Sequence, residues 1–267
     1  MAFLAIDVGN TRLKWALFER PRPGSALLAS GACLLEEIDS LGQTQWRHVW
    51  PHPTSMLGCL VAGETVRRRV EEQLVRCWSV RPRWIVSMKR QCGVTNGYDH
   101  PMRLGSDRWA SLIGARWRLP DHAVLVTIVG TAVTVDALEP DGTFAGGLIL
   151  PGYGLMLQAL EMGTAGLKVP SGGFSEFPTN TSDALMSGGS NAIAGAIERM
   201  YRNLMRRASE APTVMVSGGA ADKILPIIEL PHQQAPTLIF DGLLCMADER
   251  QPTQPTLLPD SGLIGRG

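Results

Sequence analysis

Hydrophobic and polar positions alternate most regularly near the start of the chain. An apolar run at residues 3–6 is interrupted by a polar turn at residues 7–11, and Leu13, Trp15 and Leu17 then share one face of a second run. Alternation with a period of two indicates β-strands, and the Gly-Asn pair inside the turn is typical of hairpins because both residues tolerate positive φ. The pattern predicts a β-hairpin over residues 4–18.

A second stretch, residues 124–138, repeats part of this pattern. An apolar strand again meets a turn that begins Gly-Thr, and an alternating strand leaves the turn. Aligning the two turn glycines places Ile128 over Asp7. Thr131 then lies over Asn10. Two copies of a strand–turn–strand unit suggest a duplicated domain with a nucleotide in the cleft between its halves.

The remaining chain alternates between strand and helix patterns, which indicates α/β lobes rather than an all-β fold. Helices are predicted over residues 64–75, 109–117, 155–162 and 191–207, the last separated by Gly188-Gly189 from a short helix that begins near 180. Strands are predicted over residues 56–61, 84–86 and 214–217, and a further strand at 238 is expected to lead through Asp241-Gly242 into a closing helix. The predicted organisation is an N-terminal lobe over residues 1–118, a C-terminal lobe over 119–250 and a flexible tail over 251–267.

Charge and cysteine content limit the partners and the cellular compartment expected for this chain. The 267-residue chain has 25 basic and 25 acidic side chains, so no overall field favours nucleic acid or an anionic membrane. The five cysteines are scattered, which argues against a disulfide framework or a zinc site and favours a reducing cytoplasm. No apolar segment approaches membrane-spanning length, and the N-terminal run is too short for a signal peptide.

The polar turn of the first hairpin has the chemistry of a metal–nucleotide site. Asp7 follows a buried strand, and Asn10 and Thr11 belong to a turn rich in N–H and hydroxyl groups. The backbone donors can face phosphate oxygens while Asp7 holds a hydrated Mg²⁺. The alternative is an ordinary hairpin in which the polar side chains only satisfy the turn backbone.

A loop over residues 93–108 leads into a predicted helix with Ser106 as its N-cap. Asp107 then lies in the first turn, where the helix dipole favours a negative charge. Acidic residues are common there for that structural reason alone. The functional alternative is a general base beside an alcohol substrate, with Arg103 and Arg108 neutralising a phosphate or carboxylate.

Several motifs in a fixed order resemble those of the type III pantothenate kinases, which belong to the actin, sugar-kinase and heat-shock ATPase superfamily. The matching stretches are residues 7–11, 105–108, 130–136, 146–152, 180–181 and 217–219. The resemblance implies two duplicated actin-like (ribonuclease H-like) lobes with a nucleotide cleft between them. It also implies ATP-dependent phosphorylation of the 4′-hydroxyl of pantothenate, the first step of coenzyme A synthesis.

The resemblance also assigns roles to individual residues. It implies Mg²⁺ binding by Asp7 and proton acceptance by Asp107. The implied first phosphate loop is Asp7, Val8, Gly9, Asn10, Thr11, Arg12, Leu13 and Lys14, with a further ATP contact at Thr131. The implied pantothenate contacts are Tyr98, Gly105, Ser106, Asp107, Arg108 and Thr181.

One position departs from the family pattern. The family usually has an acidic residue two positions before the second turn glycine, where it helps to hold a monovalent cation, whereas this chain has Ile128. A K⁺ or NH₄⁺ site is therefore in doubt or is built from other oxygens. The resemblance further implies a homodimer with the pantothenate pocket at the subunit interface. Two alternatives are a kinase of another small hydroxy compound and a regulatory accessory-factor relative, although retention of both Asp7 and Asp107 argues for catalysis.

Overall fold

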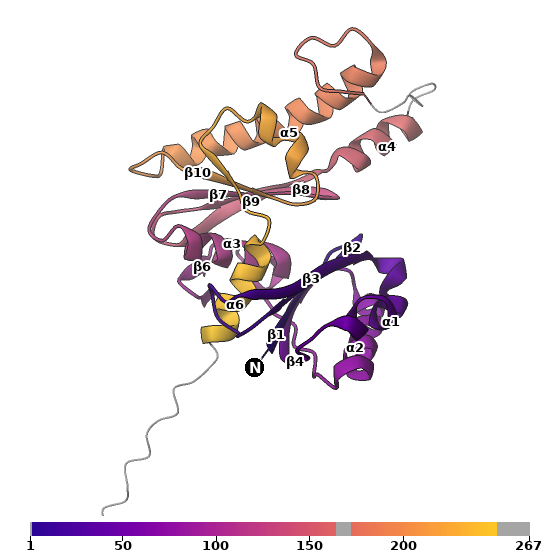
Figure 1. Ribbon diagram of the computed structural model, residues 1–267. Helices are drawn as coiled ribbons and strands as arrows, with labels where there is room; N and C mark the ends of the chain where they lie inside the picture. The colour runs from indigo at the N-terminus through magenta and orange to yellow at the C-terminus, as the bar shows by residue number, and fades with distance from the viewer. Residues whose placement is uncertain (1, 164–171, 250–267) are drawn as a thin grey trace, which may run out of the picture.

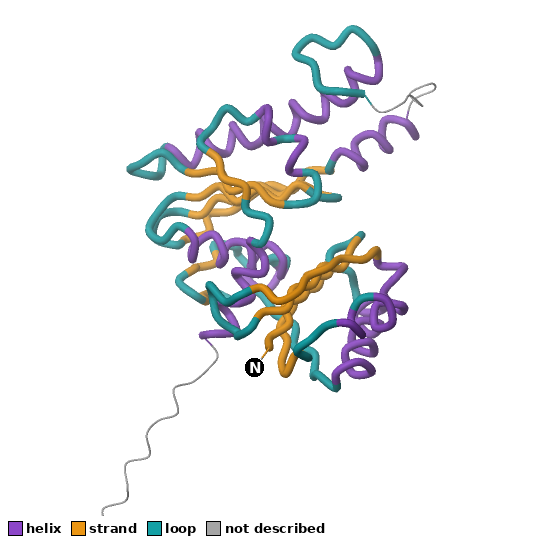
Figure 2. Tube along the Cα trace, viewed as in Figure 1, coloured by secondary structure: helices purple, strands orange, loops and turns teal. Residues whose placement is uncertain are grey.

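The chain folds into two α/β lobes, each built on its own β-sheet (Figure 1; Figure 2). The computed structural model describes residues 2–163 and 172–249. Two helices, α3 (Ser106–Arg118) and α6 (Leu238–Glu249), lie between the sheets (Figure 1). The predicted two-lobed α/β class is confirmed.

The first sheet carries the predicted N-terminal hairpin. Its strand order is β3-β2-β1-β4, with β1 (Ala2–Val8), β2 (Arg12–Phe18), β3 (Leu27–Leu34) and β4 (Pro53–Leu60). All seven residues of β1 are buried, since Phe3 and Ala5 pack on one face and Leu4 and Ile6 on the other. A strand covered on both faces reads as a continuous apolar run, which explains why β1 does not alternate.

The second sheet repeats the connectivity of the first. Its order is β11-β10-β7-β8-β9-β6-β5, with β5 (Arg90–Gln91), β6 (Val94–Asn96), β7 (Val124–Val129), β8 (Ala132–Leu138), β9 (Thr143–Pro151), β10 (Thr213–Ser217) and β11 (His232–Gln234). Strands β9-β8-β7-β10 correspond to β3-β2-β1-β4, because each set has two antiparallel pairings followed by a parallel one. The predicted duplication is therefore visible in the topology. Strands β5 and β6 come from the first 118 residues but pair in this second sheet.

Helices cover both sheets and form three hydrophobic layers. The other α-helices are α1 (Leu41–Thr44), α2 (Glu64–Trp78), α4 (Tyr153–Gly163) and α5 (Thr181–Met205). Short 3₁₀ turns are η1 (Leu35–Ser40), η2 (Trp46–His48), η3 (Pro101–Arg103), η4 (Ala221–Lys223) and η5 (Leu225–Ile227). Val70 and Leu74 of α2 pack on the first sheet, and Ile193 and Ile197 of α5 pack on the second. The central layer joins both sheets through α3 and α6.

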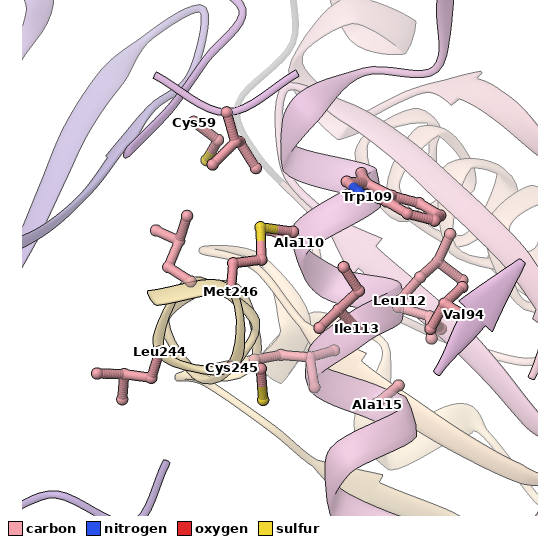
Figure 3. Packing of buried hydrophobic residues seen from close by; sticks show 14 of the residues in the cluster. Cys59, Val94, Trp109, Ala110, Leu112, Ile113, Ala115, Leu244, Cys245 and Met246 are labelled. Atoms are coloured by element: carbon pink, nitrogen blue, oxygen red, sulfur yellow. The ribbon is translucent and has the colours of Figure 1, made fainter. Parts of the chain in front are cut away.

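The central layer depends on a close crossing of α3 and α6 (Figure 3). A Cβ on Gly242 would lie 1.9 Å from the carbonyl oxygen of Ala110, and a Cβ on Gly114 would lie 2.2 Å from that of Leu238. The prediction of a strand at 238 followed by an Asp-Gly turn is therefore wrong, because the helix already begins at Leu238. Gly242 lets two helix backbones approach and does not form a turn.

Three further local predictions are wrong. Gly188-Gly189 does not interrupt α5, which runs unbroken from an Asn180 N-cap whose side chain accepts from the Asp183 N–H. Gly105, not Ser106, is the N-cap of α3, because the Ser106 hydroxyl instead exchanges hydrogen bonds with the backbone of Leu60 on β4. The strand predicted at 84–86 is reduced to a single bridge from Trp84.

Some predictions fall on residues outside those described. The tail predicted at 251–267 lies outside the described residues, as does the 164–171 part of the loop predicted to be functional. Within the described ranges, no helix combines the length and apolar character needed to cross a membrane.

Candidate active site

The turns of the two equivalent hairpins face each other across the gap between the lobes. A glycine N–H closes each turn. The Gly9 N–H donates to the carbonyl of Arg12, and the Gly130 N–H donates to the carbonyl of Ala132, each at 3.0 Å. The hydroxyl oxygens of Thr11 and Thr131 lie 2.8 Å apart. The duplicated turns therefore form the two sides of one site.

A cavity of about 380 Å³ opens between these turns. This volume falls in the range of small-molecule sites. Both lobes line the cavity, through Asp7, Gly9, Asn10, Thr11, Arg12, Lys14, Val61, Asp107, Arg108, Ser111, Ile128, Gly130, Thr131, Ala132, Thr134, Ser217, Gly218, Gly219, Ala220, Pro236, Ile239 and Phe240. The cavity thus joins both hairpin turns to the start of α3, the glycine turn after β10 and the start of α6.

Asp7 is the buried carboxylate of the cavity. It lies near the end of β1 opposite Lys14 of β2 and is 8% exposed. The Cys59 thiol on β4 donates to its Oδ1 at 3.2 Å. Burial raises the pKa of Asp7 to about 6, although the Cys59 hydrogen bond and the Lys14 charge act in the opposite direction. A cation beside this carboxylate would offset the cost of burying its charge.

The donor set suits Mg²⁺ carried by a nucleotide better than a metal held by protein alone. The described residues contain no group of three or more His, Cys, Asp or Glu side chains placed to hold a metal ion. Mg²⁺ usually binds through one or two carboxylates, while water and substrate phosphates complete its shell. Asp7 can provide the protein ligand in such a site.

Asp107 is the second carboxylate of the cavity. It lies in the first turn of α3, and its Oδ1 accepts from the Arg108 N–H at 2.8 Å. The Ser111 hydroxyl donates to its backbone carbonyl at 2.8 Å and secures the turn. A carboxylate held at the start of a helix and open to the cavity can accept a proton from a bound hydroxyl group.

Arg108 is buried next to Asp107 but pairs with a different carboxylate. Its Nε donates to Oδ2 of Asp136 at 3.0 Å, and its Nη2 donates to Oδ1 of the same residue. Its Nη1 donates to the Tyr98 hydroxyl at 2.8 Å. Burial opposes the charge, but the hydrogen bonds to Asp136 prevail and raise the pKa of Arg108, which stays a cation.

The sequence matches one protein family over most of its length. Residues 3–203 match the family model described as type III pantothenate kinase. The type III pantothenate kinase of Leptothrix cholodnii is 58% identical over 258 residues, covering 94% of this chain and 98% of that protein. That of Methylibium petroleiphilum is 59% identical over 254 residues, covering 94% and 100%. The chain belongs to the type III pantothenate kinase family.

Solved structures place this family member in the actin-like fold. A candidate 2-dehydro-3-deoxygalactonokinase from Sinorhizobium meliloti gives a TM-score of 0.59 at 13% identity, covering 94% of this chain and 99% of that one. A conserved candidate Baf family transcriptional activator from Campylobacter jejuni gives 0.53 at 19% identity, covering 92% and 98%. At such identities the likeness concerns the fold alone, and it agrees with the predicted duplicated lobes.

The structure brings most of the predicted nucleotide residues of this pantothenate kinase family member to the cavity. Asp7, Gly9, Asn10, Thr11, Arg12, Lys14 and Thr131 line it. Val8 and Leu13 do not, because both are fully buried in the outer core of the first lobe. Alternation along β1 and β2 turns these two side chains away from the ligand side, so only their backbone can serve a phosphate loop.

The predicted substrate residues are only partly brought together. Asp107 and Arg108 line the cavity, whereas Gly105 and Ser106 serve as the N-cap and first residue of α3. Tyr98 is half-buried and does not line the cavity itself, but its hydroxyl lies 2.8 Å from Nη1 of Arg108, which does. Thr181 starts α5 and is not among the cavity-lining residues.

One side of the cavity was missed by sequence reasoning. Ile239 and Phe240 of the first turn of α6, with Pro236 just before it, line the cavity together with the glycine turn at Gly218-Gly219. Their apolar run resembled an ordinary short strand, and no spacing marked it as ligand-facing. Only the return of α6 to the space between the lobes brings these side chains to the site.

Proposed function

We propose that this chain phosphorylates the 4′-hydroxyl of pantothenate with ATP, the first step of coenzyme A synthesis. The observation that carries the proposal is the convergence of Asp7, Asp107 and two phosphate-type turns on one cavity in a type III pantothenate kinase family member. Phosphoryl transfer needs phosphate donors, a metal-holding carboxylate and a group to receive the hydroxyl proton. The cavity contains one candidate for each need.

Each group of residues has a distinct role in the proposed reaction. The backbone N–H groups of both turns, with Thr11 and Thr131, bind and orient the phosphates of ATP. Asp7 would hold Mg²⁺, which would compensate the negative charge on the phosphate oxygens. Asp107 accepts the proton as the substrate oxygen bonds to the γ-phosphorus, and the bond from that phosphorus to the bridging oxygen breaks to release ADP. Apolar Ile239 and Phe240 are suited to contact the nucleoside.

The direct test is ADP release by the purified chain with Mg²⁺, ATP and pantothenate, with the phosphorylated product identified by mass. Asp107→Asn is the matched control for contaminating kinases, because it keeps the size and hydrogen-bonding shape of the side chain. Turnover of a different small alcohol in place of pantothenate would redirect the assignment to another kinase activity. The absence of any acceptor-dependent ADP release would refute it.

We also propose that the active form is a homodimer. Ile149 of β9, Met162 of α4 and Phe177 in the loop before α5 are 65%, 77% and 87% exposed. Only Tyr153 of α4 is buried in the single chain. Helix α4 contacts both β9 and α5, and large apolar side chains exposed on such neighbouring elements favour a protein contact. In a dimer formed through this face, Thr181 of a second copy would be available to the substrate, and light scattering tests the predicted mass.

The remaining assignments concern the ion and the compartment. We place the reaction in the reducing cytoplasm, in keeping with cysteines that form no disulfide among the described residues. Because Ile128 lacks a carboxylate, we propose that activation by a monovalent cation is either weakened or mediated by neutral backbone and side-chain oxygens. Such oxygens can still select K⁺, as carbonyl-lined filters do. Turnover in matched Na⁺, K⁺ and NH₄⁺ salts measures this directly.

A further inference from the structure

We propose that Asp136 is a positioning residue for substrate binding, which acts through Arg108 on the Tyr98 hydroxyl. Asp136 lies on β8 of the second lobe and is 0% exposed, and Arg108 is 5% exposed. The proposal rests on the proposed function, because it concerns how pantothenate is held.

The ion pair fixes the orientation of the guanidinium group. Nε and Nη2 of Arg108 each donate to one oxygen of Asp136. Two parallel hydrogen bonds between planar groups leave little rotational freedom, and this geometry distinguishes arginine from lysine. The third nitrogen, Nη1, is thereby pointed at Tyr98, 2.8 Å from its oxygen.

Tyr98 is held on its other sides as well. Its ring stacks on Phe144 with centroids 5.4 Å apart, and the Cζ of Arg108 lies 5.5 Å from the centroid of the tyrosine ring. The Tyr98 N–H donates to the Asn96 side chain at 3.1 Å. Because the tyrosine oxygen accepts from a cation, its hydroxyl hydrogen is directed to another acceptor. Pantothenate supplies carboxylate and amide oxygens as acceptors.

A glycine on the neighbouring strand makes room for the pair. Gly147 of β9 lies opposite Asp136 in the sheet register. A Cβ at this position would lie 1.9 Å from Oδ1 of Asp136, 2.7 Å from the backbone oxygen of Val135 and 3.0 Å from Nη2 of Arg108. Gly147 therefore leaves room both for the ion pair and for the backbone of the neighbouring strand.

The same helix carries a second arginine pair that serves as a control. Arg118, at the other end of α3, donates through Nε to Oδ2 of Asp241 on α6 at 2.8 Å. Neither Arg118 nor Asp241 lines the cavity. Loss of this pair tests what a purely structural arginine–aspartate bond on α3 contributes.

The experiment compares Asp136→Asn with Asp241→Asn in the full chain. Pantothenate binding is measured by calorimetry, nucleotide binding with a non-hydrolysable ATP analogue, and stability by thermal unfolding. Asp136→Asn should weaken pantothenate binding roughly 10-fold or more, the scale of one charge-assisted hydrogen bond, with ATP-analogue binding within about 2-fold. Asp241→Asn should lower Tm but leave pantothenate binding within about 2-fold.

A double-mutant cycle with Tyr98→Phe tests the route of the effect. If Asp136 acts through Arg108 on the tyrosine hydroxyl, adding Tyr98→Phe to Asp136→Asn should weaken pantothenate binding no further. Fully additive losses would overturn this route. Pantothenate binding by Asp136→Asn that matches Asp241→Asn would overturn the positioning role.

Tyr98→Phe alone provides a second variant if Asp136→Asn does not fold. It removes the hydroxyl that Arg108 orients but keeps the ring packed on Phe144, so KM for pantothenate should rise while KM for ATP stays constant. An unchanged KM for pantothenate would overturn the proposal. If the wild-type protein does not phosphorylate pantothenate, the proposed function itself is refuted. If the wild type turns over and the variants bind pantothenate normally, only the role of Asp136 is refuted.

Discussion

The two hairpins at the cavity have the same backbone arrangement but carry different side chains. In each, a glycine N–H closes the turn at 3.0 Å, and the following strand pairs antiparallel with the first. The first hairpin presents Asp7 opposite Lys14. The second presents Ile128 opposite Thr134, and Ile128 packs against the central hydrophobic layer.

Under the proposed function, the difference indicates which part of the duplicated unit each proposed role requires. Binding phosphate oxygens needs backbone donors and a tight turn, so both hairpins retain this geometry. Holding Mg²⁺ needs a carboxylate, and burying a carboxylate is costly unless a cation accompanies it. One such group is sufficient for a metal that arrives with the nucleotide, so the equivalent position in the second lobe can be apolar.

The largest effect on turnover is expected when Asp7 is replaced, because it is the only acidic residue of the two equivalent positions, Asp7 and Ile128. Asp7→Ala should reduce turnover by roughly 10³-fold or more, since a metal ion contributes several kcal/mol of charge stabilisation in the transition state. Ile128→Ala is the matched control and should change kcat by only a few-fold. Mg²⁺ titration of Asp7→Glu should show residual activity with altered metal dependence. An unchanged Mg²⁺ response in that variant would contradict the metal role.

The buried charge of Asp7 should also be visible in stability. Its pKa is raised from 3.8 to about 6, so the folded metal-free protein binds more protons than the unfolded chain between these values and loses stability as pH rises through this window. About two pKa units correspond to about 3 kcal/mol. Asp7→Asn should therefore be more stable than wild type by up to about 3 kcal/mol near pH 8.

Urea unfolding in EDTA at several pH values measures this difference. The advantage of Asp7→Asn should shrink as pH falls and vanish near pH 4, where wild-type Asp7 is protonated in the folded protein. An Asn variant that is no more stable than wild type at pH 8 would show that the carboxylate is already compensated without metal.

The two proposed functional carboxylates, Asp7 and Asp107, both belong to elements of the first half of the chain. Replacing Asp107 tests whether the proton acceptor, like the metal-holding group, comes from that half. Asp107→Asn should lower kcat by roughly 10²-fold, the usual range for removal of a general base. The change in unfolding free energy should stay below about 1 kcal/mol, because a helix-dipole contribution is of this size. Near-wild-type turnover would mean that Asp107 serves only the helix.

The smallest effect is expected at Ile128, where the second hairpin departs from the first. Ile128→Asp should strengthen activation by K⁺ a few-fold at low millimolar salt, because an added carboxylate attracts a nearby cation. Turnover in Na⁺ and K⁺ salts at matched ionic strength provides the measurement, with Ile128→Asn as the uncharged control. A strong K⁺ response in wild type that the aspartate does not increase would make this position irrelevant to the ion.

The sequence by itself determined the local units. The hairpins at 4–18 and 124–138 were predictable because alternation acts between neighbouring residues. The same holds for α2 and for the first-turn position of Asp107. The predicted turn conformation was wrong in detail, since neither Gly9 nor Asn10 adopts the positive φ that the Gly-Asn pair tolerates. The repeat of one unit also predicted a duplicated fold with a cleft, and most of the predicted phosphate-loop residues line that cleft.

Tertiary structure decided what depends on contacts between distant segments. The start of α6 forms a wall of the cavity only because Gly114 and Gly242 allow two helices to cross closely, and a glycine in isolation looks like a turn. Arg108 pairs with Asp136, 28 residues away, so the buried ion pair that orients its guanidinium could not be predicted from its neighbours in the sequence. Burial, which sets the pKa of Asp7, likewise arises from all the segments packed around it and not from its neighbours in the chain.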